Sequence, residues 1–313
     1  MASLCRGTEL ITENASEFKD ALATMPLPAD SPCTPKGVMM VEPKGFYVSP
    51  ETALDNHYMD VEHKANPDRA VRQFKQLVEL IRSCGVDVKV FPGSEHTPDD
   101  VFPNNVFGTV PGRLVIGHMR YPIRQREAER SDIPAFFKTR GYEIVDLRER
   151  ECVAELTGVL ILDRARRIGF CGLSERVGRA GVRAMHEAFR LKLTYCFPLT
   201  PDEYHTNVVF SVLAARACVL YPGACADAEA PGAVEAAFPG RTLMLDKHEK
   251  DHFVGNCISL NNEDLFMSQA AADAMRPSSL ATLESWGFRI HSTELDELEK
   301  AGGSLRCMVA KIF

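Results

Sequence analysis

The chain has 313 residues, of which 45% are hydrophobic and 25% are charged, and its formal net charge is −7. This length and composition allow a large buried core, in one large domain or in two smaller ones. An acidic chain gains little from counterion release on a polyanion, so the charge argues against nucleic-acid binding, and no apolar run reaches the roughly 18–20 residues that a bilayer span needs.

The first segment, residues 1–36, contains four prolines among small polar residues. It lacks the basic start and the apolar block of a secretory signal, so we expect a cytoplasmic protein. We interpret the segment as a loosely ordered N-terminal arm with one helix near residues 13–25. Residues 37–313 are predicted to form a single domain.

Ten cysteines are spread along the chain, and no two of them have CxxC spacing. This is not the pattern of a zinc site, and a chain of this length does not need a disulfide framework. Eight or nine of the ten are therefore predicted to be reduced thiols in the core. No metal and no cofactor is expected, since the chain also lacks a glycine-rich phosphate loop.

From residue 72 onward, one pattern recurs five times: an amphipathic helix, a tight turn and a short strand. Glycine closes the turn in four of the five units, as is common after a helix C-cap. The predicted helices span residues 72–84, 134–140, 182–191, 233–238 and 275–286, and the predicted strands span residues 86–91, 142–147, 192–197, 241–246 and 288–292.

Between these units lie hairpin-like pairs of strands, at residues 106–119, 158–173, 208–222 and 257–269. One unit is therefore strand, strand, helix, strand (ββαβ), and it recurs about every 50 residues. The hairpins break the alternation of an ordinary doubly wound α/β sheet. The repeat favours a ring of five modules around a central axis, and the alternative is a generic α/β protein with accidental spacing.

Polar residues recur in phase with the repeat, just before or within a hairpin strand of each unit. They are Asn105, Glu155, His205, Asn256 and Cys307. Because equivalent positions in a ring converge on its axis, the spacing predicts that a carboxylate, a histidine and a thiol meet in one central pocket. Such a group is suited to nucleophilic catalysis at an sp² carbon, with the histidine moving protons near neutral pH.

Four segments carry a resemblance to a known superfamily. They are GGSLRCM at residues 302–308, PDDVFPNNVF at 98–107, HTNVV at 205–209 and MVEPKGFYVSPETALDNHYM at 40–59. Their order and content resemble the guanidine-modifying, or amidinotransferase, superfamily, which contains arginine deiminases, arginine dihydrolases, dimethylarginine hydrolases and amidinotransferases. The resemblance covers about residues 37–313 and implies a five-bladed α/β propeller with pseudo-five-fold symmetry, the pentein fold.

The resemblance also implies roles for individual residues. Cys307 would be the nucleophile, His205 the general acid/base, and Glu155 the carboxylate that grips the guanidinium nitrogens. The implied substrate-binding residues are Asn105, Arg124, Asn56 and Asn207, with Arg124 paired to the substrate carboxylate through its planar fork.

The implied reaction is hydrolysis at a guanidinium carbon through a covalent thiouronium on the cysteine. Two departures from the family pattern bear on the substrate. Leu156 follows Glu155 where relatives often have glycine, and it is expected to narrow or dry the pocket wall. Asn105 stands where deiminases have aspartate, and an amide can bind a neutral urea because it both donates and accepts.

The favoured function is therefore arginine dihydrolase or deiminase-like activity on a small guanidino substrate. A dimethylarginine hydrolase is the second candidate. An amidinotransferase or a non-catalytic arginine-binding propeller is the alternative from another class, and a homo-oligomer is compatible with each. The sequence leaves the guanidino substrate and the number of hydrolysis steps open.

Overall fold

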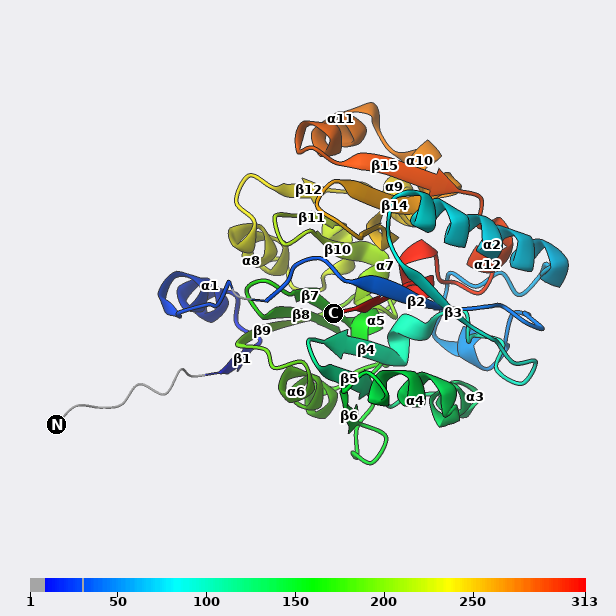
Figure 1. Ribbon diagram of the computed structural model, residues 1–313. Helices are drawn as coiled ribbons and strands as arrows, with labels where there is room; N and C mark the ends of the chain where they lie inside the picture. The colour runs from blue at the N-terminus through cyan, green and yellow to red at the C-terminus, as the bar shows by residue number, and fades with distance from the viewer. Residues whose placement is uncertain (1–8, 30) are drawn as a thin grey trace.

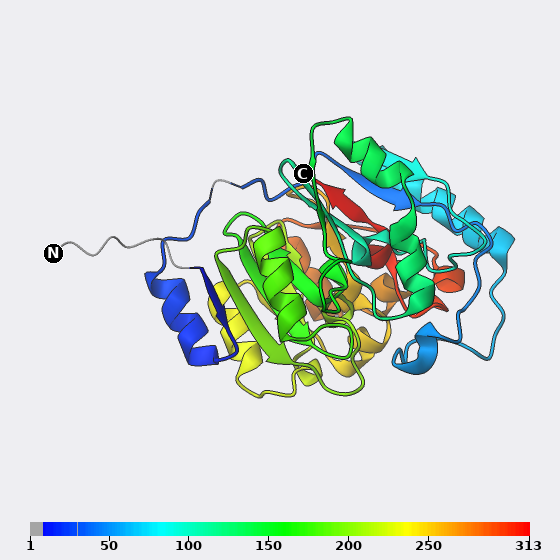
Figure 2. The same cartoon turned by 90° about the horizontal axis from the view of Figure 1, so that it is seen from below.

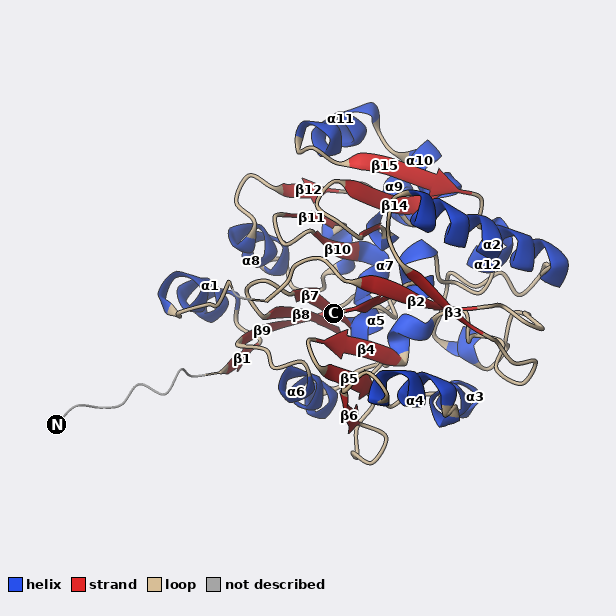
Figure 3. Cartoon of the chain, in the orientation of Figure 1, coloured by secondary structure: helices blue, strands red, loops and turns tan. Residues whose placement is uncertain are grey.

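The structure, a computed structural model, describes residues 9–29 and 31–313, and its strands form five separate sheets in a mixed α/β fold. The sheets surround the middle of the molecule, and the longer helices lie on the outside (Figures 1 and 3). Seen from below, the strands again lie inside and the helices outside (Figure 2).

Four of the sheets have three strands each. In hydrogen-bonded order they are β16 (Ala310–Ile312), β2 (Gly37–Val41) and β3 (Val88–Phe91); β4 (Phe107–Val110), β5 (Arg113–Ile116) and β6 (Glu143–Asp146); β10 (Phe210–Leu213), β11 (Ala217–Leu220) and β12 (Thr242–Met244); and β13 (Ile258–Ser259), β14 (Asp264–Ser268) and β15 (Arg289–Thr293). The fifth sheet has the order β1 (Leu10–Thr12), β9 (Leu193–Pro198), β8 (Ile168–Leu173) and β7 (Leu160–Asp163).

Each sheet contains one antiparallel pair and one parallel neighbour, as a ββαβ unit requires, and the four-stranded sheet has β1 as an additional parallel strand. The α-helices are α1 (Ala15–Thr24), α2 (Pro67–Ser83), α3 (Pro122–Gln125), α4 (Asp132–Lys138), α5 (Leu156–Val159), α6 (Arg179–Ala188), α7 (Thr206–Val209), α8 (Ala230–Ala237), α9 (Lys247–Asp251), α10 (Gln269–Ala274), α11 (Pro277–Ser285) and α12 (Asp296–Glu299). The 3₁₀ turns are η1 (Thr52–Leu54), η2 (Pro103–Asn105), η3 (Arg126–Glu129), η4 (Pro222–Ala224), η5 (Val254–Asn256) and η6 (Leu305–Met308).

The five predicted helix–turn–strand units are confirmed, with helix starts two to five residues earlier in four of them. Pro67 at the first position and the Asn66 cap explain the early start of α2, because both stabilise a helix N-terminus. In the fifth unit, α11 begins at Pro277, and residues 269–274 form a separate helix. The four turn glycines have φ between 68° and 80°, the left-handed geometry that favours glycine.

The fifth antiparallel pair was not predicted, because its strands come from opposite ends of the chain. Strand β16 pairs with β2 in antiparallel register, with Lys311 opposite Val38. This pair takes the place that a local hairpin takes in the other sheets. Since a hairpin signal depends on two strands being close in sequence, no local pattern could reveal it.

The N-terminal arm differs from the prediction of a loosely ordered segment. Its predicted helix is present as α1, and β1 pairs in parallel with β9 at the edge of a sheet. Phe18 is fully buried, and its ring stacks on Tyr195 with 4.8 Å between centroids. Burial of an aromatic ring offsets the entropy of ordering the segment, so residues 10–24 belong to the folded body.

Five short helical turns, each directly before an inner strand, contact one another in a closed circuit. The order of contact is η2, α5, α7, η5 and η6, and η6 returns to η2. The strands that follow them are β4, β7, β10, β13 and β16. Residues at equivalent places in the five units are thereby brought together in the middle of the molecule.

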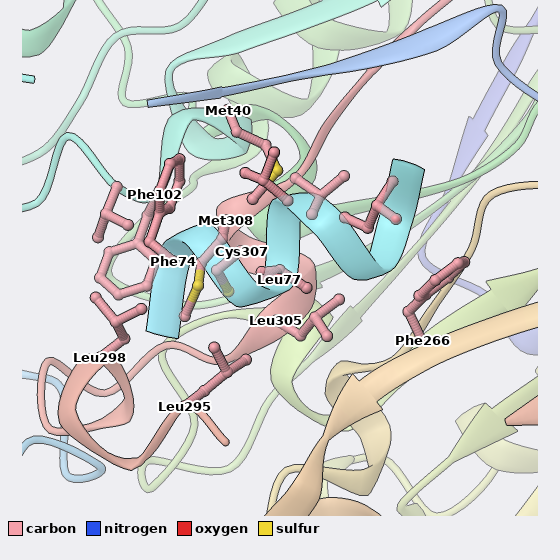
Figure 4. Close-up of a cluster of buried hydrophobic side chains, with 14 of the residues drawn as sticks. Met40, Phe74, Leu77, Phe102, Phe266, Leu295, Leu298, Leu305, Cys307 and Met308 are labelled. Atoms are coloured by element: carbon pink, nitrogen blue, oxygen red, sulfur yellow. The ribbon is translucent and has the colours of Figure 1, made fainter. Parts of the chain in front are cut away.

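The apolar core is divided among the sheets and the helices that cover them. Helix α2 buries Phe74, Leu77 and Ile81 against the sheet that contains β2 and against the segment around Cys307 (Figure 4). None of the helices in the described part of the chain is long and apolar enough to cross a membrane. The nine described cysteines are all unpaired thiols, and Cys5 lies outside the described residues.

Candidate functional site

The Cys307 thiol lies in η6, and it is 1% exposed. Its near neighbours include Phe102, Leu305 and Met308, which belong to the same apolar cluster (Figure 4). Burial in these surroundings raises the pKa of Cys307 above its ordinary value, because a thiolate is poorly solvated there. The thiol is therefore neutral in the resting protein near pH 7.

Two amide side chains hold the sulfur atom in place. The Nδ2 atoms of Asn256 and Asn207 lie 3.3 Å and 3.4 Å from the Cys307 Sγ. Both amides oppose the effect of burial on the thiol pKa, since they stabilise a developing thiolate. Asn256 also accepts a hydrogen bond from the backbone N–H of Arg306 at 3.1 Å, which fixes the amide against the η6 turn.

A buried histidine and carboxylate form the second part of the site. His205 and Glu155 are both fully buried, and Nε2 of the imidazole lies 2.7 Å from Oε2 of the carboxylate. Burial lowers the pKa of His205, and the neighbouring Glu155 only partly opposes this shift. The neutral ring therefore donates from Nε2, and its Nδ1 is left as a buried acceptor without a partner among the described residues.

A small cavity adjoins the thiol, with a volume of about 10 Å³. It is lined by Thr52, Asn56, Asp99, Phe102, Asn105, Arg124, Arg176, Tyr204, Ala301, Gly303 and Cys307. A volume of about 10–15 Å³ holds a single water molecule. The cavity is therefore narrow in this structure, with space for little more than one water molecule.

The wall of this thiol pocket combines two arginines with one carboxylate. Arg124 is buried and held by Glu127 through contacts of 2.7 and 2.8 Å, and its Nε lies 4.0 Å from Asp99. Arg176 is held by Asp55 and donates from Nη1 to Glu155 at 3.1 Å. This pairing of both charge signs suits a ligand that itself carries an ammonium and a carboxylate.

The predicted site residues are thus brought together, although not all of them reach the pocket. Cys307, Asn105, Arg124 and Asn56 line it, and Asn207 contacts the thiol. His205 and Glu155 are outside the lining. Both Glu155 oxygens already have partners, since Oε2 bonds His205 and Oε1 accepts from the backbone N–H of Arg120 at 3.0 Å.

Leu156 was predicted to narrow the pocket, and this prediction is wrong. Its side chain is fully buried in a core cluster and points toward Gly108 and Gly117, so it is not part of the pocket wall. The residue has φ of 29°, which glycine adopts without strain and leucine does not. The departure from glycine therefore affects backbone strain and core packing rather than the pocket.

Asp99 and Arg176 were not predicted as site residues. Asp99 lies inside the PDDVFPNNVF motif, where an acidic residue six positions before Asn105 was the available signal. Arg176 follows β8 in a loop without a distinctive sequence pattern. The structure identifies it as a site residue because it is 1% exposed and forms ion pairs with Asp55 and Glu155. A buried arginine cannot be told from a surface one by composition alone.

One group among the described residues has the geometry to hold a metal ion. The ligand atoms of Cys84, Asp264 and His291 lie within 4.8 Å of one another, in a different sheet from the thiol pocket. Asp264 is already bound by Asn261 and Arg289. A cationic guanidinium on this carboxylate opposes a second cation, so the cluster is better described as a hydrogen-bond network.

Comparison with known proteins places the chain in a family. The family model for eukaryotic N,N-dimethylarginine dimethylhydrolase matches residues 42–313. The bifunctional arginine dihydrolase/ornithine cyclodeaminase AgrE of Nostoc sp. is 26% identical over 251 residues, which is 80% of this chain and 34% of that protein. An uncharacterised Caenorhabditis elegans protein is 22% identical over 89% of this chain and 94% of its own length.

Solved structures share the fold. The substrate-bound N-terminal domain of ArgZ, a cyanobacterial arginine dihydrolase, superposes with a TM-score of 0.78 at 22% identity, covering 88% of this chain and 97% of that one. A dimethylarginine dimethylaminohydrolase variant with an S-methyl-L-thiocitrulline adduct superposes with a TM-score of 0.70 at 18% identity. The match covers 88% of this chain and 99% of that one. The chain spans about a third of the length of the bifunctional relatives, 34%, and matches their arginine-dihydrolase fold.

Proposed function

The chain belongs to the N,N-dimethylarginine dimethylhydrolase family of the guanidine-modifying superfamily, and from that membership we propose that it hydrolyses the guanidinium carbon of an arginine-type amino acid. The observation that carries the proposal is the pocket itself. A buried thiol held by two amides faces a wall with Asp99, Arg124 and Arg176. We also propose that residues 37–313 form one catalytic domain, a five-bladed propeller whose blades are the five sheets.

The two ends of the substrate would be bound by opposite parts of the wall. Arg124 and Arg176 would attract the α-carboxylate, because guanidinium groups match its planar geometry. Asp99 would attract the α-ammonium group. The guanidinium would then point toward Cys307 and Asn105. Since both Glu155 oxygens already accept hydrogen bonds from the protein, Glu155 would act mainly by holding His205 in one tautomer.

The reaction would begin when the substrate cation enters. A positive charge beside the thiol lowers its pKa and counteracts the effect of burial. The free Nδ1 of His205 would accept the thiol proton, and the sulfur would form a bond to the guanidinium carbon. The imidazolium would return the proton to the departing nitrogen as the C–N bond breaks. Water activated by His205 would then break the C–S bond and release citrulline.

Asn105 supports a second hydrolysis, as in an arginine dihydrolase. Its Oδ1 is buried without a partner among the described residues, so it is available to a ligand. The neutral ureido group of citrulline would bind an amide better than it would bind an unpaired buried carboxylate. A second attack by Cys307 would convert citrulline to ornithine, with release of a second ammonia and carbon dioxide.

Hydrolysis of dimethylarginine is the second candidate, and the family match over residues 42–313 favours it. In that reaction the leaving group is dimethylamine and the product is citrulline. A transferase would use the same covalent intermediate with an amine in place of water. A non-catalytic binding protein would not need the thiol, the imidazole and the carboxylate together.

The deciding experiment is a product assay on the purified chain. Arginine, citrulline, agmatine and methylated arginines are incubated separately, and ammonia, methylamines, citrulline and ornithine are quantified, with Cys307→Ser as the inactive control. We expect arginine to yield ornithine, and agmatine to react poorly because it lacks the carboxylate. Release of methylamines with no turnover of arginine would establish the second candidate. Normal turnover by Cys307→Ser would overturn both.

Asn105→Asp is predicted to shift the product from ornithine toward citrulline. A carboxylate at this position would favour the cationic first substrate and disfavour the neutral second one. The measurement is the ratio of citrulline to ornithine at full conversion of arginine. Asn262→Asp is the control for the added charge, because this exposed amide lies outside both the thiol pocket and the second cavity. An unchanged product ratio in Asn105→Asp would show that this residue does not determine whether one or two hydrolyses occur.

A further inference from the structure

A second cavity, of about 40 Å³, shares no lining residue with the thiol pocket. It is lined by residues within or just after the inner strands, such as Thr109, Ala214 and Lys311, and by Asn104, Thr157 and Arg306 in the turns before those strands. All five repeat units contribute to its wall. It is therefore a feature of the ring as a whole and is separate from the candidate catalytic site.

Three cationic side chains line this cavity: Arg164, Arg306 and Lys311. Among the described residues, no carboxylate lines it with them, and no ion pair involves any of the three. The acidic residue next to Arg164 in the sequence, Asp163, accepts a hydrogen bond from Arg166 at 2.6 Å and does not line the cavity. Three like charges in a partly enclosed space repel one another and are costly to desolvate.

The hydrogen-bonding capacity of the three cations is largely unused. Arg306 is 9% exposed and donates from Nη1 to Ser211 Oγ at 3.0 Å, but its buried Nε has no partner among the described residues. Arg164 donates to the backbone oxygen of Thr109. The Nζ of Lys311 makes no hydrogen bond to any part of the chain that the structure describes. An unpartnered buried donor points to a ligand that supplies the acceptor.

The electrostatics of the cluster agree with this geometry. Burial, together with the nearby Arg306 and Arg164, lowers the pKa of Lys311 to about 7. Burial and Arg306 likewise lower the pKa of Arg164 to about 9. Without an anion, the cluster can reduce its charge only by releasing a proton from Lys311. With an anion, all three groups can stay charged.

We propose that the cavity lined by Arg164, Arg306 and Lys311 is a binding site for a tetrahedral oxyanion of the phosphate class. A single water needs about 10–15 Å³, so 40 Å³ has room for one such ion but not for a nucleotide. Phosphate carries several acceptor oxygens and two charges near neutral pH, which matches three cations with unused donors. The site is distinct from the thiol pocket, because the two cavities share no lining residue, although Arg306 directly precedes Cys307 in η6.

The test is a thermal-unfolding titration of the purified chain with sodium phosphate, at an ionic strength held constant with sodium chloride. The wild type is expected to show a saturable rise in Tm, because a ligand that binds only the folded state stabilises it. Lys311→Met should have a higher Tm than the wild type without phosphate, since one repelling charge is gone. It should bind phosphate at least tenfold more weakly. Lys75→Met, which removes an exposed lysine, should follow the wild type.

Isothermal titration with inorganic phosphate and with glycerol phosphate distinguishes a free ion from a phosphate ester. Equal binding of both shows that the site also accepts an ester whose remainder lies in solvent, and binding of inorganic phosphate alone restricts it to the free ion. If Lys311→Met does not fold, Arg164→Gln gives the same comparison. The proposal is overturned if the wild type shows no saturable response, or if the cavity variant responds as strongly as the wild type.

Discussion

A buried thiol is a poor nucleophile until it loses its proton, and Cys307 is buried among apolar side chains. Asn207 and Asn256 donate to its sulfur but carry no charge. The imidazole of His205 is also neutral in the resting protein, and the neighbouring Arg306 lowers the pKa of the thiol less than burial raises it. We therefore expect the thiol to become reactive when a cationic ligand lowers its pKa.

Alkylation of Cys307 by iodoacetamide should therefore become faster with increasing pH beyond pH 9. Because the pKa of the thiol is raised, the thiolate fraction is small near neutral pH and grows until the pH passes that raised pKa. The measurement is the labelling rate of the peptide containing Cys307, by mass spectrometry, from pH 6 to pH 10. A saturating guanidinium ligand should move the profile to lower pH. A rate that levels off below pH 8 in the free protein would show that the thiol is already activated.

Gly158→Ala should impair turnover while leaving the fold intact. An added Cβ would lie 2.8 Å from Cε1 of His205 and 2.9 Å from Oδ1 of Asn105, so one of these side chains would have to move. A displacement of about 1 Å in a reacting group can cost about a hundredfold in rate, and we expect a fall in kcat of tenfold or more. Gly178→Ala is the matched control, because nothing lies within 4 Å of its added Cβ. Wild-type kcat in Gly158→Ala would show that His205 and Asn105 need not hold these positions.

At the scale of elements, the segment that covers the thiol pocket is the long connection between β2 and α2. Its Asn56 lines the pocket and approaches Gly302 so closely that an added Cβ there would be 2.4 Å from Nδ2. Asp55 holds Arg176, and Met59 bridges to Ala301. Because the cavity of about 10 Å³ is smaller than any amino acid, we infer that this segment would have to move for an amino acid to bind there.

Tyr58→Phe should weaken closure of this segment. The Tyr58 hydroxyl donates to Oε2 of Glu203 at 2.6 Å and so links the covering segment to the loop between β9 and α7. Hydrogen bonds to charged groups are worth about 1.5–3 kcal/mol, so KM is expected to rise by about tenfold. Limited proteolysis should also cut residues 42–66 faster. Tyr47→Phe, in the same segment and 43% exposed, is the control. Equal protease sensitivity of the two variants would exclude Tyr58 as a closing contact.

The helices and strands were largely predictable because local sequence patterns specify each repeat unit. Amphipathic helices ended by glycine, and strands on either side of short turns, require no knowledge of distant contacts. The common phase of Asn105, Glu155, His205, Asn256 and Cys307 was predictable for the same reason. In contrast, the pairing of β16 with β2 and the burial of Arg176 depend on residues far apart in the chain. The burial of Phe18 in the N-terminal arm could not be predicted either, because it depends on the folded surface around β9.

At the scale of the whole molecule, β16 joins the last repeat unit to the first. It pairs with β2 and contacts β4 of the next sheet. Phe313, which follows β16, is 1% exposed and donates its backbone N–H to Thr109 Oγ1 at 3.0 Å. Five units in a closed ring would share one cooperative transition, whereas five units in an open array would lose stability mainly at the damaged end.

Phe313→Ala distinguishes a closed ring from an open array. Replacing a buried phenylalanine by alanine costs about 3–5 kcal/mol, which is a large part of the 5–15 kcal/mol that stabilises a typical domain. If the ring is closed, hydrogen exchange should accelerate in all five sheets, because opening the junction between β16 and β2 exposes both neighbouring units. Phe313→Leu, which keeps most of the apolar contact, should remain close to the wild type. Faster exchange confined to β16, β2 and β3, with unchanged protection in β7, β10 and β13, would mean that the units are coupled only to their neighbours and that the ring does not unfold as one.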